Sequence, residues 1–359
     1  MPISSDDKFP IPDGPIKNPC QWQGRDFQGK ESWITRWSDQ ALAELMAAIE
    51  TVTRAGKKAP QFTKADFPLP SLAAELQAIR DDLETGNGFS ILRGIPSDDL
   101  SDDDAEILFW GMMVHLGQPM SQNSAGHLLG HVRDLGLTTQ DTKVRNYQTT
   151  EELFFHNDSC DVLMLLCRRT AKKGGQSRLA SIPTLFNAMW AEDPALTAEL
   201  FRPFAFDRRG EPGRPDEPET PYFVLPIMNW SDGLITARMV PRGYIRSAQR
   251  YDDAPRLTPR MDAAIDLMER VSVRPECSFA FDLEPGDVEL VNNYAVFHAR
   301  TDYVDHEEPD KKRHMLRAWL SVPNSRPLPP WFKERWGSIA PGEPRGGIYA
   351  ARPAATSTE

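Results

Sequence analysis

Two side chains that can bind a metal ion lie two residues apart in the segment LFFHNDSC. In an extended chain, residues i and i+2 point to the same side, so the imidazole of His156 and the carboxylate of Asp158 could converge on one ion. A motif this short also arises by chance. The alternative is a strand end at which the two side chains bond to each other or to solvent.

A further histidine, His298, lies 140 residues after Asp158 in the segment GDVELVNNYAVFHAR. It follows an apolar stretch and an Asn292-Asn293 turn. Two histidines and one carboxylate can occupy one face of an octahedral metal and leave three positions open, an arrangement diagnostic of non-haem Fe(II) oxygenases. The alternative is a half-buried histidine that is hydrogen-bonded inside a barrel.

Two arginines lie four residues apart in KRHMLRAWL, residues 312–320. If this segment is a strand, Arg313 and Arg317 share one face, and buried guanidinium groups need partners. A guanidinium can bind a carboxylate through two parallel hydrogen bonds, which predicts anion binding. Ion pairs with Asp302 or Asp305 explain the sequence equally well.

The turn GGQS, residues 174–177, leads into another predicted strand. The hydroxyl of Ser177 could donate a hydrogen bond to an anion, although ordinary turn chemistry accounts for the same residues. His127 and His131 have a spacing that would bind metal on a helix, but the glycines that precede them disfavour a helix there.

The elements that must position these side chains fall into two groups. Helical periodicity and capping residues predict helices over residues 39–55, 71–85, 101–116 and 258–270, the last of them on the surface. Short apolar segments between Gly, Pro and Asp predict many strands from about residue 144 onward. The pattern favours a mainly β protein with flanking helices and a sandwich or jelly-roll core.

The chain is expected to form one domain, because no repeat or sharp linker divides it. Residues 1–20 are polar and proline-rich and are interpreted as an arm, residues 21–345 as the domain, and residues 346–359 as a flexible tail. The charged, proline-rich segment 207–221 is interpreted as a loop that could act as a flap.

Composition and charge disfavour several kinds of partner. A net charge of -11 argues against nucleic acid and against docking on anionic membranes. No segment is apolar enough to span a membrane, and the first residues lack the basic and apolar regions of a signal peptide. The four cysteines have no paired spacing, so we expect reduced thiols in a cytoplasmic protein.

The order of these motifs resembles that of the taurine dioxygenase and clavaminate synthase-like family of Fe(II)- and 2-oxoglutarate-dependent oxygenases. Four motifs follow one another within roughly residues 85–325: HxD, GGxS, a distant histidine and R-x-x-x-R. The resemblance implies a double-stranded β-helix core in which His156, Asp158 and His298 bind Fe(II). It also implies that Arg313 binds the distal carboxylate of 2-oxoglutarate, assisted by Ser177 where relatives often carry threonine.

This resemblance implies a dioxygenase that consumes O2 and 2-oxoglutarate, oxidises a C–H bond and releases succinate and CO2. Hydroxylation is the expected outcome, with desaturation or oxidative cyclisation as alternatives at the same centre. A halogenase is disfavoured, because it would need a small residue in place of Asp158. A zinc hydrolase explains neither Arg313 nor the GGQS turn, and a non-catalytic barrel that binds a small acid needs no metal ligands.

The substrate is expected to be a small anion or an amino-acid-like molecule. Arg317 matches a position that reaches acidic substrates in relatives, so it is the predicted partner of the substrate's anion. Residues 118–148 are expected to build the pocket, with polar contacts from Gln122, Asn123, Asn146 and Tyr147. The sequence does not identify the substrate, and it is compatible with a homo-oligomer.

Overall fold

The structure is a computed structural model that describes residues 3, 7–137, 148–214 and 220–350. Its strands are β1 (Ile34–Arg36), β2 (Phe89–Arg93), β3 (Gln118–Met120), β4 (Leu129–Val132), β5 (Leu153–His156), β6 (Val162–Arg169), β7 (Lys173–Gly174), β8 (Ser177–Ser181), β9 (Phe204–Asp207), β10 (Tyr222–Leu225), β11 (Met228–Ser231), β12 (Leu234–Ala237), β13 (Ser278–Phe281), β14 (Val288–Asn292), β15 (Val296–Arg300), β16 (Tyr303–Val304) and β17 (His314–Ser321). Its α-helices are α1 (Asp39–Arg54), α2 (Leu72–Thr85), α3 (Asp102–Leu116), α4 (Ile182–Glu192), α5 (Pro194–Thr197), α6 (Gly243–Ala248), α7 (Pro259–Ser272) and α8 (Lys333–Trp336).

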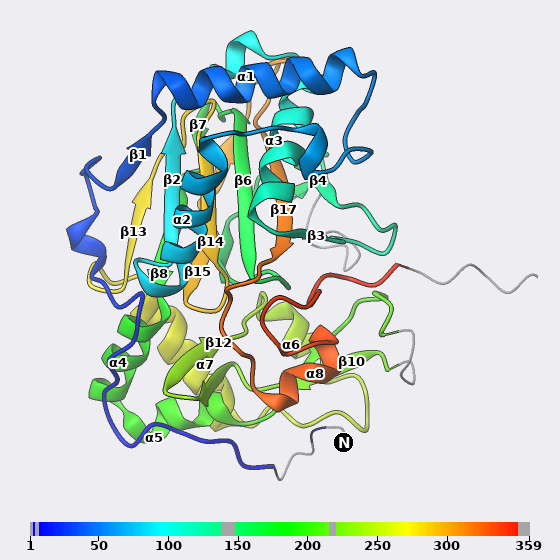
Figure 1. The fold of residues 1–359 in the computed structure, drawn as a ribbon. Helices are drawn as coiled ribbons and strands as arrows, with labels where there is room; N and C mark the ends of the chain where they lie inside the picture. Colours follow the sequence, from blue (N-terminus) through cyan, green and yellow to red (C-terminus); the bar gives the residue numbers. More distant parts are fainter. Residues whose placement is uncertain (1–2, 4–6, 138–147, 215–219, 351–359) are drawn as a thin grey trace, which may run out of the picture.

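Two sheets form the core of the molecule (Figure 1). The larger sheet has seven strands in the order β1-β2-β14-β6-β17-β3, with β4 also paired to β17, and the smaller has the order β13-β8-β15-β5. Apolar side chains from both sheets meet in one cluster, among them Leu163, Val291 and Trp319 from the larger sheet and Leu179 and Val296 from the smaller. The predicted double-stranded β-helix with flanking helices is confirmed.

Strand β6 illustrates why the larger sheet is apolar on both faces. Leu163 points into the space between the sheets, whereas Met164 and Leu166 pack against the helices on the other face. The sequence of a strand that is covered on both faces is continuously apolar and does not alternate between apolar and polar residues. The run VLMLLC therefore predicts a buried central strand.

Helices cover the outer faces of the two sheets (Figure 1). Helices α1–α3 pack on the larger sheet, and Ser38 and Ser101 cap α1 and α3 by accepting backbone N–H bonds of 3.1 Å. Helices α4 and α7 pack in the cluster beside the smaller sheet. The predicted surface helix at 258–270 is α7, and the structure buries its apolar face, including Met261 and Ile265.

The chain continues to pack beyond residue 345. The backbone N–H of Gly347 donates to Ser159 O at 2.6 Å, and that of Ile348 donates to Ser121 O at 2.8 Å. Residues 346–348 were expected in a flexible tail, but they are held against the body of the protein; the remaining boundaries of arm, domain and tail stay predictions. No helix in the described part of the chain is long and apolar enough to cross a membrane.

A buried ion pair fixes the last part of the chain to the start of β6. Asp161 and Arg345 have fully buried side chains, and Arg345 Nε donates to Asp161 Oδ1 at 2.8 Å. The same carboxylate accepts from the Tyr294 hydroxyl at 2.7 Å and from the Val322 N–H at 2.9 Å. Loss of Arg345 would therefore leave a buried carboxylate without its counter-charge.

Replacing Arg345 by methionine should lower the free energy of unfolding by about 3–5 kcal/mol, because one partner of a buried pair is removed. Urea unfolding followed by circular dichroism measures the change. Arg54→Met is the matched control, since Arg54 is 79% exposed and its pair with Glu50 contributes little. Equal effects of the two substitutions would contradict this role for Arg345.

Candidate metal centre and adjoining cavity

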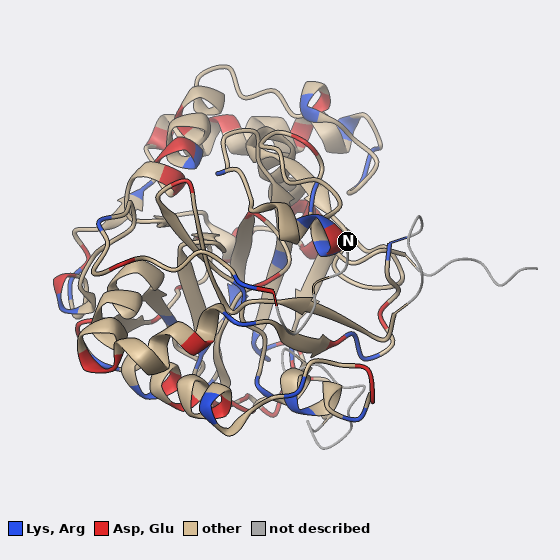
Figure 2. Ribbon diagram, turned by 90° about the horizontal axis from the view of Figure 1, so that it is seen from below, with Lys and Arg blue, Asp and Glu red and all other residues tan. Residues whose placement is uncertain are grey.

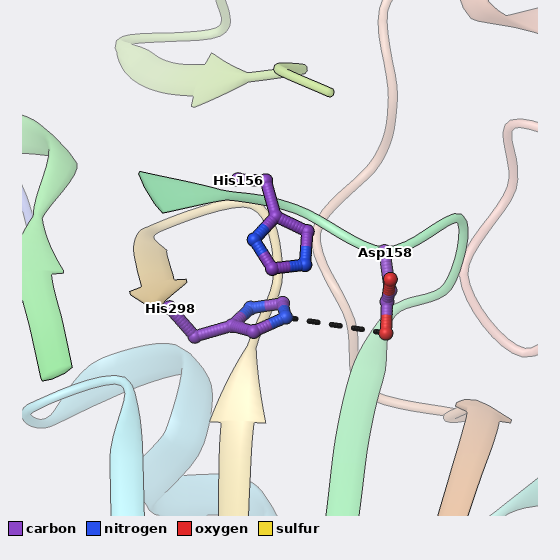
Figure 3. A group of neighbouring side chains, drawn as sticks. All are labelled: His156, Asp158 and His298. Atoms are coloured by element: carbon purple, nitrogen blue, oxygen red, sulfur yellow. Dashed lines mark ion pairs between the residues drawn. The ribbon is translucent and has the colours of Figure 1, made fainter. Parts of the chain in front are cut away.

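Three predicted metal ligands, His156, Asp158 and His298, lie together in the structure. Their candidate ligand atoms are all within 4.8 Å of one another, and His298 Nε2 is 4.0 Å from Asp158 Oδ2. Figure 3 shows the two imidazole rings and the carboxylate turned toward a common point, with the ring centroids 4.2 Å apart. The three donors can therefore reach one ion.

Strand pairing brings these residues together from distant parts of the chain. His156 ends β5 and is the register partner of His298 in β15. Asp158 lies in the loop that joins β5 to β6, and its backbone N–H donates to Asn293 Oδ1 at 3.1 Å. The turn at Asn292 and Asn293, noted in the sequence, thus holds the loop that carries the carboxylate.

Hydrogen bonds around the three ligands leave suitable atoms for a metal. His156 Nδ1 lies 2.9 Å from the carbonyl oxygen of Phe154, which can only accept, so Nδ1 carries the proton and Nε2 has its lone pair available. The Trp319 indole N–H donates to Asp158 Oδ2 at 2.7 Å and orients the carboxylate.

The electrostatic environment favours the protonation states that a metal requires. Burial lowers the pKa of His298 to about 3, helped by the neighbouring His156, and burial also lowers the pKa of His156. Burial acts to raise the pKa of Asp158, but Arg317 and the two histidines outweigh it and the pKa is lowered. Two neutral imidazoles and one ionised carboxylate are the donor set of a non-haem Fe(II) site.

Arg313 lies in the interior without the ion pair that the sequence allowed. Its side chain is 4% exposed and Nη1 has no hydrogen-bond partner among the described residues. Asp305 accepts a bond of 2.8 Å from the backbone N–H of Arg313 rather than from the guanidinium. Arg300 also lies near the Tyr303 ring, whose centroid is 4.7 Å from the guanidinium carbon of Arg300 and 5.3 Å from that of Arg313. These two buried guanidinium groups are suited to bind an anion.

The GGQS turn packs directly against this arginine. Gly174 and Gly175 both have φ of +76°, and a Cβ on Gly175 would lie 3.3 Å from Arg313 Nε, so glycine permits the close approach. Ser177 begins β8, and its hydroxyl donates to Glu289 Oε2 at 3.1 Å. The turn that leads to Ser177 therefore lies against Arg313, and the Ser177 hydroxyl already has an acceptor in Glu289.

A cavity of about 360 Å³ opens beside the metal ligands. Its lining includes Arg317, Gln122 and Asn123, three of the predicted substrate contacts, whereas Asn146 and Tyr147 lie outside the described residues. Arg317 Nη1 is 3.8 Å from Asp158 Oδ2, so the acid beside Arg317 is one of the three candidate metal ligands.

The side chain of Gln122 is occupied by bonds within the protein. Its Oε1 accepts from Arg317 Nε at 2.7 Å, and its amide donates to the carbonyl oxygens of Leu128 and Arg317. Gln122 therefore holds Arg317 in place, whereas the sequence suggested a polar contact between Gln122 and the substrate. Asn123 is half-buried in the lining of the cavity, where its side chain bonds to His127.

The other histidines lie away from the three ligands. Residues 129–132 form strand β4 rather than a helix, so His127 and His131 do not share a helical face. His131 Nδ1 is 2.9 Å from His314 Nε2, on the side of β17 opposite to Arg317. His131 and His314 therefore contact each other, away from the three candidate ligands.

Sequence reasoning did not identify Glu289, Arg238 and Arg335. Glu289 is 1% exposed in β14, and a charged residue within the apolar run DVELVN was an available signal, because a buried charge needs a partner. Arg238 and Arg335 line the cavity. They lie far from any motif and had no comparable signal.

A double-stranded β-helix that directs two histidines and one carboxylate at a single point defines a mononuclear non-haem iron oxygenase. The model of the taurine catabolism dioxygenase TauD, TfdA family matches residues 53–319, and the chain belongs to this family. Its cofactor and co-substrates are accordingly Fe(II), 2-oxoglutarate and O2, and the chain is a 2-oxoglutarate-dependent oxidoreductase.

Two curated proteins are similar in sequence. The FR-33289 synthase of Streptomyces rubellomurinus (strain ATCC 31215) is 30% identical over 338 residues, which cover 92% of this chain and 97% of the relative. The taurine hydroxylase-like protein SAT17 of Stachybotrys chartarum (strain CBS 109288 / IBT 7711) is 24% identical over 317 residues, which cover 85% of this chain and 79% of the relative.

Solved structures of two oxygenases share the fold. Asparagine oxygenase, in complex with Fe(II), 3-hydroxyasparagine and succinate, has a TM-score of 0.59 at 16% identity, covering 80% of this chain and 93% of that one. The non-haem iron oxygenase OrfP, in complex with Fe, succinate and (3S)-hydroxy-L-Arg, has a TM-score of 0.58 at 14% identity, with the same coverage.

The buried Glu289 makes the metal-free protein sensitive to pH. Burial, with Asp287 nearby, raises its pKa to about 7 against an ordinary value of 4.5, although Ser177 and Arg313 act in the opposite direction. The folded state therefore keeps a proton that the unfolded chain loses. Stability from this proton is fully present below about pH 4.5 and is lost as the pH rises to about 7.

Glu289→Gln should consequently stabilise the metal-free protein above pH 7, by up to about 3 kcal/mol, and have little effect near pH 4.5. Thermal unfolding at several pH values measures the difference from wild type. Glu50→Gln, at a site 72% exposed on α1, is the control and should give only a small difference from wild type. A pH-independent effect of Glu289→Gln would show that its carboxyl does not titrate as described.

Proposed function

We propose that this protein hydroxylates an unactivated C–H bond of a small anionic or amino-acid-like substrate, with release of succinate and CO2. The observation that carries the proposal is the convergence of His156, Asp158 and His298 beside a cavity that also contains Arg317. Two oxygenases of this fold have been crystallised with hydroxylated amino acids, which supports hydroxylation as the reaction. Cytoplasmic location and any homo-oligomeric state remain predictions.

Each group of residues has a distinct task in this proposal. His156, Asp158 and His298 would hold the iron, which with 2-oxoglutarate and O2 supplies an oxidant strong enough to remove hydrogen from carbon. Arg313 would anchor the distal carboxylate of 2-oxoglutarate through its unpartnered Nη1. Ser177 would assist if its hydroxyl turns from Glu289 toward that carboxylate. Arg317, held by Gln122, would face the anion of the substrate.

Desaturation or oxidative cyclisation at the same centre remains the alternative outcome, because it depends on the substrate and its placement. A non-catalytic barrel that binds a small acid is the alternative from another class. Anaerobic titration with Fe(II) and then 2-oxoglutarate distinguishes it, since chelation of iron by the co-substrate produces a weak visible absorption band. A zinc hydrolase would leave Arg313 without a role.

Asp158→Ala should abolish substrate-dependent succinate release and weaken Fe(II) binding, because it removes the one anionic ligand. Anaerobic Fe(II) titration and mass spectrometry of succinate give independent readouts. Asp310→Ala, a substitution at an exposed position, is the control and should leave both unchanged. Full oxygenase activity in Asp158→Ala would refute the proposed metal site.

Arg313→Ala should raise the KM and Kd for 2-oxoglutarate by ~10–150-fold, since a charge-assisted pair contributes about 1.5–3 kcal/mol. Arg317→Ala is the matched comparison and should instead lower kcat/KM for the substrate, with little change in the KM for 2-oxoglutarate. An unchanged KM for 2-oxoglutarate in Arg313→Ala would transfer the anchoring role to Arg317. Efficient turnover of a substrate without an anionic group would exclude the role of Arg317.

A further inference from the structure

The cavity beside the metal centre carries an excess of positive charge. Its lining contains four arginines, at positions 209, 238, 317 and 335, and three acids, Asp158, Asp207 and Glu211. Asp158 is a predicted metal ligand, and Asp207 already pairs with Arg250 at 3.1 Å. Glu211 acts electrostatically on both Arg238 and Arg335, without an ion pair to either. Figure 2 shows several segments coloured for Lys or Arg near the middle of the molecule.

Arg238 and Arg335 are the most deeply buried of these cations. Each is 5% exposed, and they donate to the same atom, Ser159 Oγ, at 3.0 Å and 3.1 Å. The two donating nitrogens are therefore no more than about 6 Å apart. Within the described ranges, no carboxylate lies within ion-pair distance, 4.0 Å, of either guanidinium. Two like charges buried this closely need an anion.

Both guanidinium groups have donors to spare. A guanidinium offers five N–H bonds. Arg238 uses Nη1 for Asn157 O at 2.5 Å and Nη2 for Ser159, while its Nε has no partner in the described part of the chain. Arg335 uses Nη1 for Gly347 O at 2.7 Å and Nη2 for Ser159. Burial, with the neighbouring Arg335, lowers the pKa of Arg238 to about 10, so it stays charged at neutral pH.

Backbone pairing places this arginine pair next to the metal ligands. Met239, the residue after Arg238, exchanges hydrogen bonds with Asn157: the Asn157 N–H donates to Met239 O at 2.8 Å, and the Met239 N–H donates to Asn157 Oδ1 at 2.9 Å. Asn157 lies between His156 and Asp158, so the segment that carries two of the three candidate metal ligands also carries two acceptors of the arginine pair, Asn157 O and Ser159 Oγ. A small molecule could contact both.

We propose that Arg238 and Arg335 form an anion subsite of the substrate pocket, separate from Arg317, which binds an oxyanion group of the substrate. This inference rests on the proposed function and narrows its substrate class to small molecules with a carboxylate, sulfonate or phosphonate at the end held by this pair. Two guanidinium groups with several open donors favour a group with more than one negative oxygen. The remaining anion or amino-acid-like part of the substrate would then face Arg317.

A purely structural role is the alternative, because the same arginines fix Ser159 and the segment at Gly347. The two roles differ in a measurable way: a structural pair stabilises the fold, whereas a subsite also binds anions. Arg168 is the matched control. It is 6% exposed and lies outside the cavity. It donates to the hydroxyl and carbonyl oxygens of Ser97 and to the Leu100 carbonyl, and unlike the pair it also has a carboxylate partner, Asp102, at 3.2 Å.

The test measures anion binding by the full-length, metal-free protein, so that iron cannot take up the probe. Isothermal titration with methylphosphonate, methanesulfonate and acetate compares wild type with Arg238→Gln, Arg335→Gln, Arg317→Gln and Arg168→Gln. We expect saturable binding of at least one probe, tightest for methylphosphonate, and a loss of at least ~10-fold in affinity in Arg238→Gln and Arg335→Gln. Arg168→Gln should bind as wild type does. The order of affinities for the three probes identifies which oxyanion group the pair prefers.

Absence of saturable binding to wild type would overturn the subsite, and so would a loss confined to Arg317→Gln. If the glutamine variants fail to fold, Arg238→Lys and Arg335→Lys keep the charge and should still weaken binding, because lysine lacks the planar fork. Anion binding without any turnover would count against the proposed oxygenase reaction alone. Turnover together with absent anion binding would count against the subsite alone.

Discussion

The antiparallel pairing of β5 with β15 is the constraint on which the metal centre depends. It sets His156 opposite His298, and β8 holds the other edge of β15 in place. Because side chains alternate between the faces of a strand, a slip of one residue would turn a histidine out of the interior. The loop after β5 then needs only two more residues to bring Asp158 to the same point, and Trp319 from the opposite sheet orients its carboxylate.

The site requires charged side chains in the interior of the sandwich, and these lower the stability of the fold. The guanidinium groups of Arg300 and Arg313 are buried there, and burial of a charge is unfavourable without a partner. Apolar clusters on both outer faces supply the stability that tolerates them. In the proposed function, bound anions supply the missing counter-charges. 2-Oxoglutarate would bind at Arg313, and the substrate would bind at Arg317 and at the pair formed by Arg238 and Arg335.

Local sequence patterns were sufficient to predict many of the helices and strands. Serines at 38 and 101 cap helices where the sequence predicts them, and the run VLMLLC forms a strand buried on both faces. The packing of residues 346–348 could not be read in the same way, because backbone hydrogen bonds to Ser159 and Ser121 hold them and no side-chain pattern reports such bonds. The burial of α7 likewise depends on which elements lie against it.

The sequence by itself identified His156, Asp158 and His298 as candidate metal ligands and linked Arg313 with Ser177, because short spacings and the order of the motifs indicate that chemistry. Only the tertiary structure decided that Gln122 holds Arg317, that Glu289 accepts from Ser177, and that two arginines 97 residues apart share Ser159. The physical reason is that the backbone geometry of neighbouring residues fixes which side chains share a face, whereas contacts between distant residues depend on how sheets, helices and loops pack.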